Sequence, residues 1–411
     1  MRNLKIITII FLAGAAVCLS AILYLALSQG YRLGNRFGMN GDSNVQNPGN
    51  YSLALEKELD AESVRSLKID YGRAYNDVYF YATDGDAILI REYMNFTPRE
   101  SQISAVELNG QELSIRGTQR RSGFFSSFSV TFQHAYTEVY MPAGLADGLE
   151  ELYVKTVSGD IFSDVSFYAQ KGFYASSTSG DILFPEIKAG QIQIASTSGN
   201  IRLTDAAAES IHLSTVSGDI SVEQAEGDTA VSATSGNVTL GHMDGDIRIS
   251  TISGDMSVGE AKGSMTFSST SGIQRLQNGT GSFEADTTSG DILVERLDGN
   301  FNIQTTSGDF ALSEGSGCGG VETISGEVRI FLRELNGDLD VSTTSGNVNF
   351  RLPGTGSWIL NFDSASGECS TFFDDQLQFN KRGNHAEGQY GDGGKIIEVS
   401  TTSGDLKITE Y

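Results

Sequence analysis

Carboxylates recur at a fixed place in this sequence and are the first candidates for chemistry. An Asp follows a Ser-Gly pair again and again, as in TTSGDIL at 287–293, TVSGDI at 156–161 and TTSGDL at 401–406. A column of such side chains would bring like charges together, which is unfavourable unless a cation bridges them. Calcium is the candidate cation, because it prefers oxygen ligands such as carboxylates. The members of this Asp column are Asp160, Asp181, Asp219, Asp255, Asp291 and Asp309.

The same phrase also has a structural interpretation, which we favour. Asn takes the place of Asp in several copies and relieves repulsion without a metal, as at Asn200, Asn237 and Asn347. Each turn lacks the G-G-x-G-x-D pattern of calcium-binding β-rolls. Gly can adopt a positive φ at a corner, Ser and Asp can hydrogen-bond turn backbone, and a β-branched residue before Ser can pack inward. We therefore predict no metal site and no cofactor.

Two segments outside the repeat place basic residues beside aromatic ones, which suits a membrane interface or a glycan. They are QRRSGFFSSF at 119–128 and FNKRGNHAEGQYGDGG at 379–394. Either can instead be a plain loop, the first with its Phe side chains covering one end of the repeat. Because loops on a rigid scaffold often carry function, the candidate binding residues are Arg120, Arg121, Phe124, Phe125, Lys381, Arg382, His385 and Tyr390.

The sequence contains no recognisable catalytic constellation. It has no Cys/His metal spacing, no P-loop and no nucleotide-binding fingerprint. Its three cysteines, Cys18, Cys318 and Cys369, do not make a disulfide framework, although one bridge between the last two is possible. The histidines are scattered, at His134, His212, His242 and His385. We predict a non-enzymatic protein without catalytic residues.

A nine-residue period, paired into eighteen, decides where these side chains lie. The glycine of the Ser-Gly pair recurs every 18 residues from 218 to 326, and a second glycine falls midway each time. After each glycine, polar and apolar residues alternate, as in Gly218-Asp219-Ile220-Ser221-Val222. Alternation predicts a strand with one buried face, and a fixed period predicts a solenoid. We therefore predict an all-β fold, a parallel β-helix or β-solenoid with coils of about 18 residues.

Because every coil starts in the same phase, equivalent residues should stack in columns. Adjacent coils would then pair as parallel strands about 4.8 Å apart. The apolar positions of the two facing sheets would fill the interior. The residues predicted to form it include Ile220, Val222, Val231, Ile247, Ile249, Met256, Val258 and Phe267.

Charge and the N-terminal segment restrict the environment. The 411 residues carry 52 Asp and Glu against 28 Lys and Arg, a net charge of −24, which repels nucleic acid and anionic lipid. The apolar run 6–27 follows Arg2 and Lys5 and can span a bilayer core of about 30 Å. An uncleaved signal anchor is the favoured interpretation. A cleaved secretory peptide and a lipoprotein signal at Cys18 are the alternatives, and all three place the rest of the chain outside the cytoplasm.

Four regions follow from these features. We predict a signal-anchor transmembrane helix at 1–28 and a flexible linker, rich in Gly and Asn, at 29–50. An N-terminal β region at 51–150 would start or cap the solenoid. The repeat solenoid itself would occupy 151–411.

The repeats and their flanks resemble a known family. S-T-x-S-G-D-I every eighteen to twenty residues, SLKIDYGRAYNDVYFYATDGDAILI near the start and GDGGKIIEVSTTSGDLKI at the end are similar to the bacterial putative-adhesin β-strand-repeat family, over about 51–411. The resemblance implies a single-pass envelope protein with a β-helical ectodomain and carries over no catalytic residues. The sequence departs from the pattern at Gly272-Ile273-Gln274 and near 369–400.

We therefore predict a membrane-anchored, extracytoplasmic, non-enzymatic β-solenoid that serves as an adhesin or cell-envelope interaction protein. Its partners would be a glycan or protein of the envelope or a cell surface, with no nucleic acid. One alternative is an envelope-stress sensor or regulatory component that acts through a membrane partner. Another is a carbohydrate-active β-helix enzyme, which a cluster of carboxylates with Lys or Arg on one face would favour.

Overall fold

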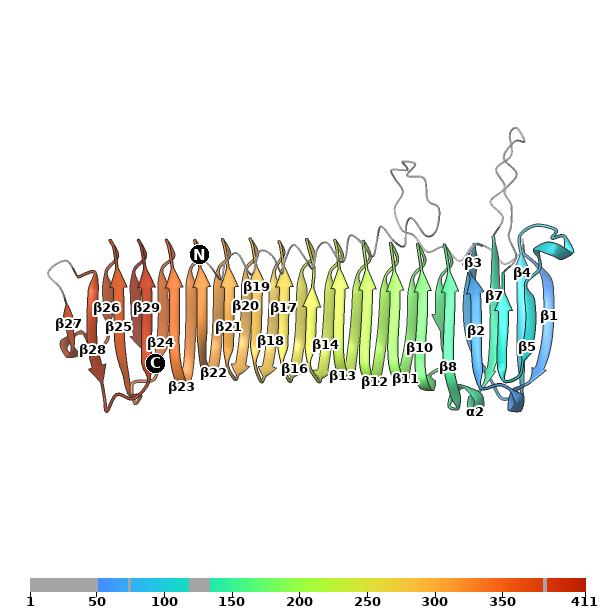
Figure 1. The fold of residues 1–411 in the computed structure, drawn as a ribbon, viewed down its shortest axis with the longest axis horizontal. Coiled ribbons are helices and arrows are strands. Elements are labelled where there is room, and N and C mark those ends of the chain that lie inside the picture. The colour runs from blue at the N-terminus through green and yellow to red at the C-terminus, as the bar shows by residue number, and fades with distance from the viewer. Residues whose placement is uncertain (1–50, 73–74, 118–133, 380–382) are drawn as a thin grey trace, which may run out of the picture. The chain divides into compact units, whose positions relative to one another are not determined.

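The computed structural model describes residues 51–72, 75–117, 134–379 and 383–411. These residues form 30 strands that wind into a parallel β-solenoid of about 11 turns, which confirms the predicted fold class (Figure 1). The coils average about 19 residues, close to the predicted 18. Within these described ranges, no helix has the length and apolar character needed to cross a membrane. The predicted anchor and linker lie outside them.

The central coils follow the sequence repeat, with register shifts in the pairings β10–β11, β12–β13 and β22–β23. Their strands are β10 (Phe167–Ser177), β11 (Ile182–Ser196), β12 (Ile201–Thr215), β13 (Ile220–Ala233), β14 (Val238–Asp244), β15 (Ile247–Ser250), β16 (Met256–Lys262), β17 (Met265–Ser269), β18 (Gln274–Thr280), β19 (Phe283–Thr287), β20 (Ile292–Asp298), β21 (Phe301–Thr305), β22 (Phe310–Thr323) and β23 (Val328–Thr343). Ile201 pairs with Ile220 across 19 residues, and Ile220 pairs with Val238 across 18. Every pairing in this region is parallel, as the sequence period requires.

Alternation along each strand produces the core. In β16, for example, Met256, Val258 and Ala261 are buried, while the residues between them face outward or lie at the surface. All eight residues predicted to form the interior are confirmed there, none more than 2 % exposed. Burying each such side chain stabilises the fold by about 1.5–3 kcal/mol relative to leaving it in water.

The glycine of the Ser-Gly pair is required by close stacking. A Cβ atom on Gly290 would lie 1.9 Å from the carbonyl oxygen of Gly272, one coil earlier. Of the glycines in this column, only Gly272 has a positive φ, at 123°. The predicted positive φ is therefore wrong for the rest of the column. A positive φ does occur at five of the six midway glycines, such as Gly245 with φ 134°, the exception being Gly317.

The residue three places before that glycine faces the interior, and the residue two places before it faces out. Thr287 is 7 % exposed, and its hydroxyl accepts a hydrogen bond from the backbone N–H of Gly290 at 3.0 Å. By contrast, Ile252 and Ile324 are 42 % and 46 % exposed. The prediction that the β-branched residue before Ser packs inward is wrong, because strand alternation gives the buried place to its neighbour.

The first coil does not lie at the N-terminal end of the stack. The elements here are β1 (Ser52–Asp60), η2 (Ala61–Ser63), β2 (Ser66–Tyr71), β3 (Asn76–Thr83), β4 (Ala87–Met94), η3 (Glu100–Gln102), β5 (Ala105–Asn109), β6 (Glu112–Arg116), β7 (Ala135–Pro142), α2 (Ala143–Ala146), β8 (Leu149–Thr156) and β9 (Ile161–Ser163). In one sheet β2 lies between β6 and β8, and in the other β3 lies between β7 and β9. Antiparallel β4, β5 and β1 cover the end (Figure 1).

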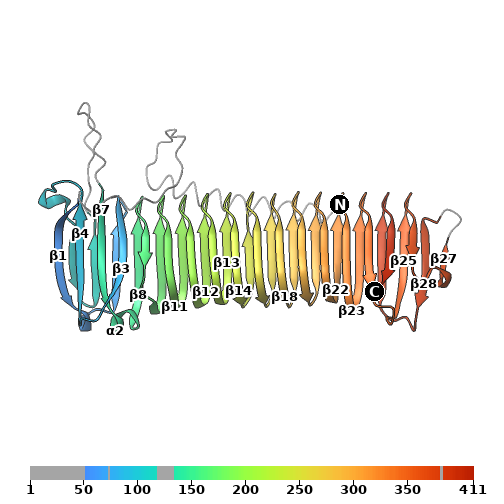
Figure 2. The ribbon, with the colours of Figure 1, turned by 180° about the vertical axis from the view of Figure 1, so that it is seen from behind.

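The last coil is also set inside the stack. The elements here are β24 (Val348–Leu352), β25 (Trp358–Ser364), β26 (Cys369–Thr371), η4 (Asp374–Gln376), β27 (Leu377–Phe379), β28 (His385–Tyr390), β29 (Ile396–Thr401) and β30 (Leu406–Glu410). β29 lies between β23 and β25, and β30 lies between β24 and β26. Antiparallel β28 and β27 close this end, as Figure 2 shows from behind. Antiparallel strands therefore cover the outer edges of β6, β7 and β25, which would otherwise be open to pairing with other chains.

Candidate binding surface

Two of the eight residues that the sequence singles out as binding candidates lie within the described part of the chain. Arg120, Arg121, Phe124, Phe125, Lys381 and Arg382 lie outside the described residues. His385 and Tyr390 are the first and last residues of β28. The loop interpretation of 379–394 is therefore wrong for this stretch, which is a strand paired with β25 and β27.

Tyr390 belongs to the aromatic packing of the C-terminal cap. Its ring stacks on Trp358, with centroids 5.1 Å apart, and contacts Phe373 at 4.9 Å. Its hydroxyl donates to the Gly354 carbonyl at 2.6 Å. These contacts give Tyr390 a structural role. His385 Nδ1 lies 3.6 Å from a carboxylate oxygen of Asp363 at the surface, and a binding role for His385 stays a prediction.

The Asp column is a hydrogen-bond ladder between coils. The N–H of Asp181 donates to Asp160 Oδ1 at 2.9 Å, and the N–H of Asn200 donates to Asp181 Oδ1 at 2.7 Å. The same bond recurs as far as Glu368, whose N–H donates to Asp405 Oδ1. Asp and Asn serve equally because each offers a carbonyl-type oxygen. Among the described residues, no group of three or more His, Cys, Asp or Glu side chains is arranged to hold a metal ion.

The two cysteines that the sequence offers as disulfide partners are free thiols. Cys318 and Cys369 are each partly buried, and Cys318 Sγ lies 3.1 Å from Asn300 Oδ1 one coil away. Burial, with the Asp374 carboxylate, raises the pKa of Cys369 to about 12, so this thiol is a poor nucleophile at neutral pH.

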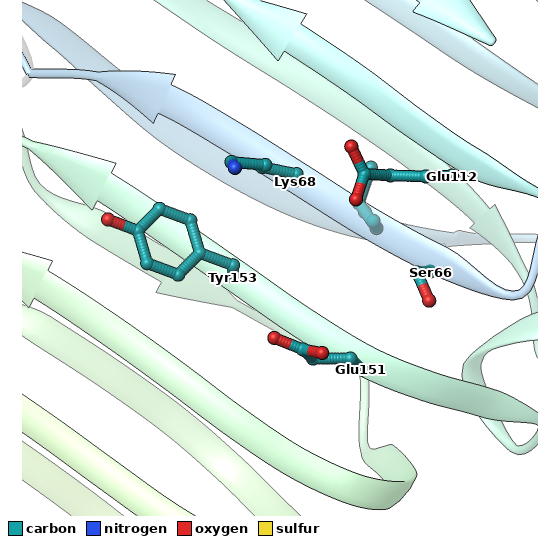
Figure 3. Close-up of a pocket in the computed structure, with 6 residues that line it drawn as sticks. Ser66, Lys68, Glu112, Glu151 and Tyr153 are labelled. Carbon is teal, nitrogen blue, oxygen red and sulfur yellow. The ribbon is translucent and has the colours of Figure 1, made fainter. Parts of the chain in front are cut away.

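A depression lies on the outer face of β6, β2 and β8 (Figure 3). Lys68 Nζ lies 5.6 Å from the ring centroid of Tyr153, and the carboxylates Glu112 and Glu151 are exposed beside them. Carboxylates with a lysine on one solenoid face are the combination that would favour the alternative of a carbohydrate-active β-helix enzyme. The lining residues are Ser66, Leu67, Lys68, Glu112, Glu151 and Tyr153.

The opposite sheet at the same end carries a dense set of outward aromatic side chains, which we call the tyrosine face. Alternation in β3 and β7 turns every second residue outward, and the register sets Tyr79 beside Phe162 of β9 and Tyr81 beside Tyr140 of β7. Antiparallel β4 adds Tyr93 next to Tyr136. All members are partly exposed. The tyrosine face consists of Tyr51, Tyr79, Tyr81, Tyr93, Tyr136, Tyr140 and Phe162.

Ring contacts make this face continuous. Tyr93 and Tyr136 stack with centroids 4.8 Å apart and planes 17° from parallel. Tyr81 lies 5.4 Å from Tyr140, and Tyr79 lies 6.3 Å from Phe162. Tyr79 joins these pairs, because its ring centroid is 6.0 Å from that of Tyr136 and 6.4 Å from that of Tyr81. These distances lie within the range of favourable aromatic pairs, each worth about 0.5–1.5 kcal/mol beyond burial.

Polar partners hold the phenol groups in place. Tyr79 donates to Asp77 Oδ2 at 3.3 Å, and Tyr140 donates to Glu138 Oε2 at 3.1 Å. Burial, followed by the Glu138 carboxylate, raises the pKa of Tyr136 to about 12, and burial also raises the pKa of Tyr79. These hydroxyls therefore stay protonated at neutral pH and keep their hydrogen-bonding capacity.

One cation lies against this face. The Arg91 guanidinium carbon is 5.6 Å from the Tyr140 ring centroid, and Arg91 Nε donates to Glu56 Oε2 at 2.9 Å. The sequence does signal the face, because Y-F-Y in β3 and Y-T-E-V-Y in β7 place tyrosines two or four residues apart on one side of a strand. We missed it, since β3, β7 and β4 become neighbours only through the end topology.

Comparison with known proteins identifies the family. A profile described as Toastrack DUF4097 matches residues 64–262, 227–309 and 244–409. The chain belongs to the Toastrack DUF4097 family. The matches leave almost no part of the solenoid outside this Toastrack domain, which is a domain of unknown function. The predicted membership of an adhesin-like β-repeat family is thereby confirmed.

Other comparisons add little to the Toastrack assignment. No curated protein matches the chain. A solved structure described as a "putative cell adhesion protein" from Clostridium sporogenes ATCC 15579 is similar over 87 % of this chain and 99 % of that chain. Its sequence identity is 9 % and its TM-score is 0.16, so it carries no argument about function.

Proposed function

We propose that this Toastrack protein is a non-enzymatic adhesin or cell-envelope interaction protein. The observation that carries the proposal is the tyrosine face, a continuous set of outward aromatic side chains on a rigid sheet. Exposed aromatic patches of this kind mark interaction sites. The Ser-Gly-Asp phrase does not compete for this role, because its side chains hold neighbouring coils together.

The cellular setting is part of the same proposal. The apolar run 6–27 would anchor the protein in the cell membrane as a single span, with the solenoid on the extracytoplasmic side. Protease added to intact cells should then digest the solenoid, and membrane fractions should retain the remainder. Protection of the solenoid in intact cells with digestion only after lysis would contradict the extracytoplasmic placement.

Binding is tested with residues 50–411, which form one compact unit. Labelled protein is added to isolated bacterial cell walls, intact cells and surface proteins, with calcium and then with chelator. Saturable binding to walls or cells supports the proposal. Absence of binding to all of them contradicts it and favours the envelope sensor that acts through a membrane partner.

A carbohydrate-active enzyme is a second candidate because of the depression on β6, β2 and β8. Glu112 and Glu151 would supply the carboxylates and Lys68 the positive charge. Incubation with wall and plant polysaccharides, followed by an assay for new reducing ends or unsaturated products, decides this. Product that disappears in Glu112→Gln or Glu151→Gln would establish the enzyme, and no product from any polysaccharide would count against it.

A further inference from the structure

We propose that the tyrosine face binds a neutral polysaccharide chain. This inference rests on the proposed binding function and names its ligand class. Sugar rings present apolar C–H faces edged by hydroxyls, so they need aromatic surface together with hydrogen-bond partners. The face offers both in alternation: Tyr79 lies across from Glu138, and Glu138 lies across from Arg91.

The aromatic side chains are already held in position. Tyr79, Tyr140 and Tyr51 each have a hydroxyl partner, in Asp77, Glu138 and His134 respectively. Ring contacts fix Tyr93 against Tyr136. Little rotamer freedom remains to be lost, and preorganisation of this kind strengthens binding by lowering its entropic cost.

Charge decides between neutral and anionic ligands. The carboxylates of Asp77 and Glu138 lie among the rings, and Glu56 pairs with Arg91 at the edge. Together with the net charge of −24 on the chain, these groups repel polyanions and anionic membranes. The same carboxylates accept hydrogen bonds from sugar hydroxyls, so a neutral glycan is the complementary ligand.

The dimensions of the face suit a chain rather than a single sugar. Apart from Tyr51, its rings come from β4, β7, β3 and β9, which are consecutive neighbours in one sheet. Four strands at about 4.8 Å spacing cover close to 15 Å from first to last. Several sugar rings laid across the strands would therefore contact the aromatic side chains in succession.

The test is native affinity electrophoresis of residues 50–411 in gels that contain a neutral β-glucan, mannan or dextran. A gel with polygalacturonate and vesicles of anionic phospholipid serve as the other arms. The variant is Tyr81→Ala with Tyr140→Ala. Its matched control is Phe331→Ala with Tyr411→Ala, an aromatic pair 4.9 Å apart that also has a nearby arginine but lies at the other end of the solenoid.

We expect a neutral polysaccharide to retard the wild type, and the Tyr81/Tyr140 variant to bind at least tenfold more weakly. The Phe331/Tyr411 control should bind like the wild type. If the alanine variant unfolds early, the pair Tyr81→Leu and Tyr140→Leu, which keeps apolar volume without a ring, takes its place.

Three outcomes would overturn the proposal: retardation by no neutral polysaccharide, wild-type affinity in the ring-free variant, or binding to polygalacturonate or vesicles alone. Cell walls separate this failure from failure of the proposed function. Walls that bind wild type and ring-free variant equally leave the adhesin proposal standing and remove the tyrosine face from it.

Discussion

At the scale of single residues, the fold requires glycine, which has no Cβ atom, at position 290. Gly290 has no room for a Cβ atom because the Gly272 carbonyl oxygen would lie 1.9 Å away. We expect Gly290→Ala to lower the free energy of unfolding by at least about 2 kcal/mol, since the obstacle is rigid backbone. Chemical denaturation measures this loss.

The matched control is Gly320→Ala, in the same solenoid. A Cβ atom there would meet nothing nearer than 3.8 Å. It should change stability little. An equal effect at both positions would mean that glycine acts through chain flexibility rather than through close stacking.

Gln274 is a polar residue at a position where its neighbours are apolar. It is 1 % exposed and pairs with Met256 on one side and Ile292 on the other. Its Nε2 donates to Ser269 Oγ and to the Asp286 carbonyl, but its Oε1 has no partner. We expect Gln274→Ile to stabilise the fold by about 1 kcal/mol, because an unsatisfied buried acceptor disappears.

Thermal and denaturant unfolding check the Gln274 prediction. Gln277→Ile, at an exposed position of the same strand, is the control and should have little effect. Lower stability in Gln274→Ile would show that the two donated hydrogen bonds outweigh the missing one.

Because of Tyr136, we expect the free energy of unfolding to change with pH in the alkaline range. Burial and Glu138 raise its pKa to about 12, above the usual value of about 10 for a free phenol. A raised pKa means that the folded state holds the proton more tightly. This contribution to stability is complete below pH 10 and declines as pH rises towards 12.

Absorbance titration of the phenolate tests this assignment. Tyr136→Phe should remove a late-ionising tyrosine and flatten the fall in stability between pH 10 and 12. Loss of a tyrosine that titrates near 10 would contradict the raised pKa.

At the scale of the elements, the coil is the unit that can be removed. Deletion of 254–271 joins Ser253 to Gly272 and restores the Ser-Gly phrase in register. Since each coil contacts only its neighbours, we expect cooperative unfolding to persist in a slightly smaller protein. Deletion of only nine residues, 254–262, should disrupt folding, because it removes β16 while leaving β17.

Circular dichroism with analytical ultracentrifugation checks both deletions. A nine-residue deletion that folds as well as the eighteen-residue one would contradict the paired period.

The structure of the central coils could be predicted because patterns within each strand and between consecutive repeats determine it. Alternation within β16 and a period of 18 give the strands, their parallel pairing and the buried residues. The ends were not predictable in the same way. The pairing of β2 with both β6 and β8 joins segments about 40 to 90 residues apart, and no period in the sequence marks these contacts. The tyrosine face lies at such an end. The alternation of its tyrosines within each strand could therefore be read from the sequence, whereas the pairing that brings β3, β7 and β4 together could not.

At the scale of the whole solenoid, we expect β29 and β30 to contribute more to its stability than their length suggests. β29 and β30 each pair on both sides, so removal of 396–411 leaves β23 and β24 without a partner on the side facing the C-terminal cap and separates that cap from them. We expect this truncation to lower stability more than deletion of 254–271, although it removes fewer residues.

Limited proteolysis and thermal unfolding compare the two deletions. Early cleavage within 358–379 is expected only for the truncated chain. Equal stability of the two would mean that the cap docks on β23 and β24 without the inserted coil.

The inserted coil also sets an order of events during synthesis. Residues 358–390 leave the ribosome before 396–410, yet they lie beyond them in the stack. Until β29 and β30 have been synthesised, β25 and β26 of the cap lack their parallel partners, and the edges of β23 and β24 stay unpaired. The solenoid can grow coil by coil as it emerges, but it closes only when its final strands slide into a gap between segments made earlier.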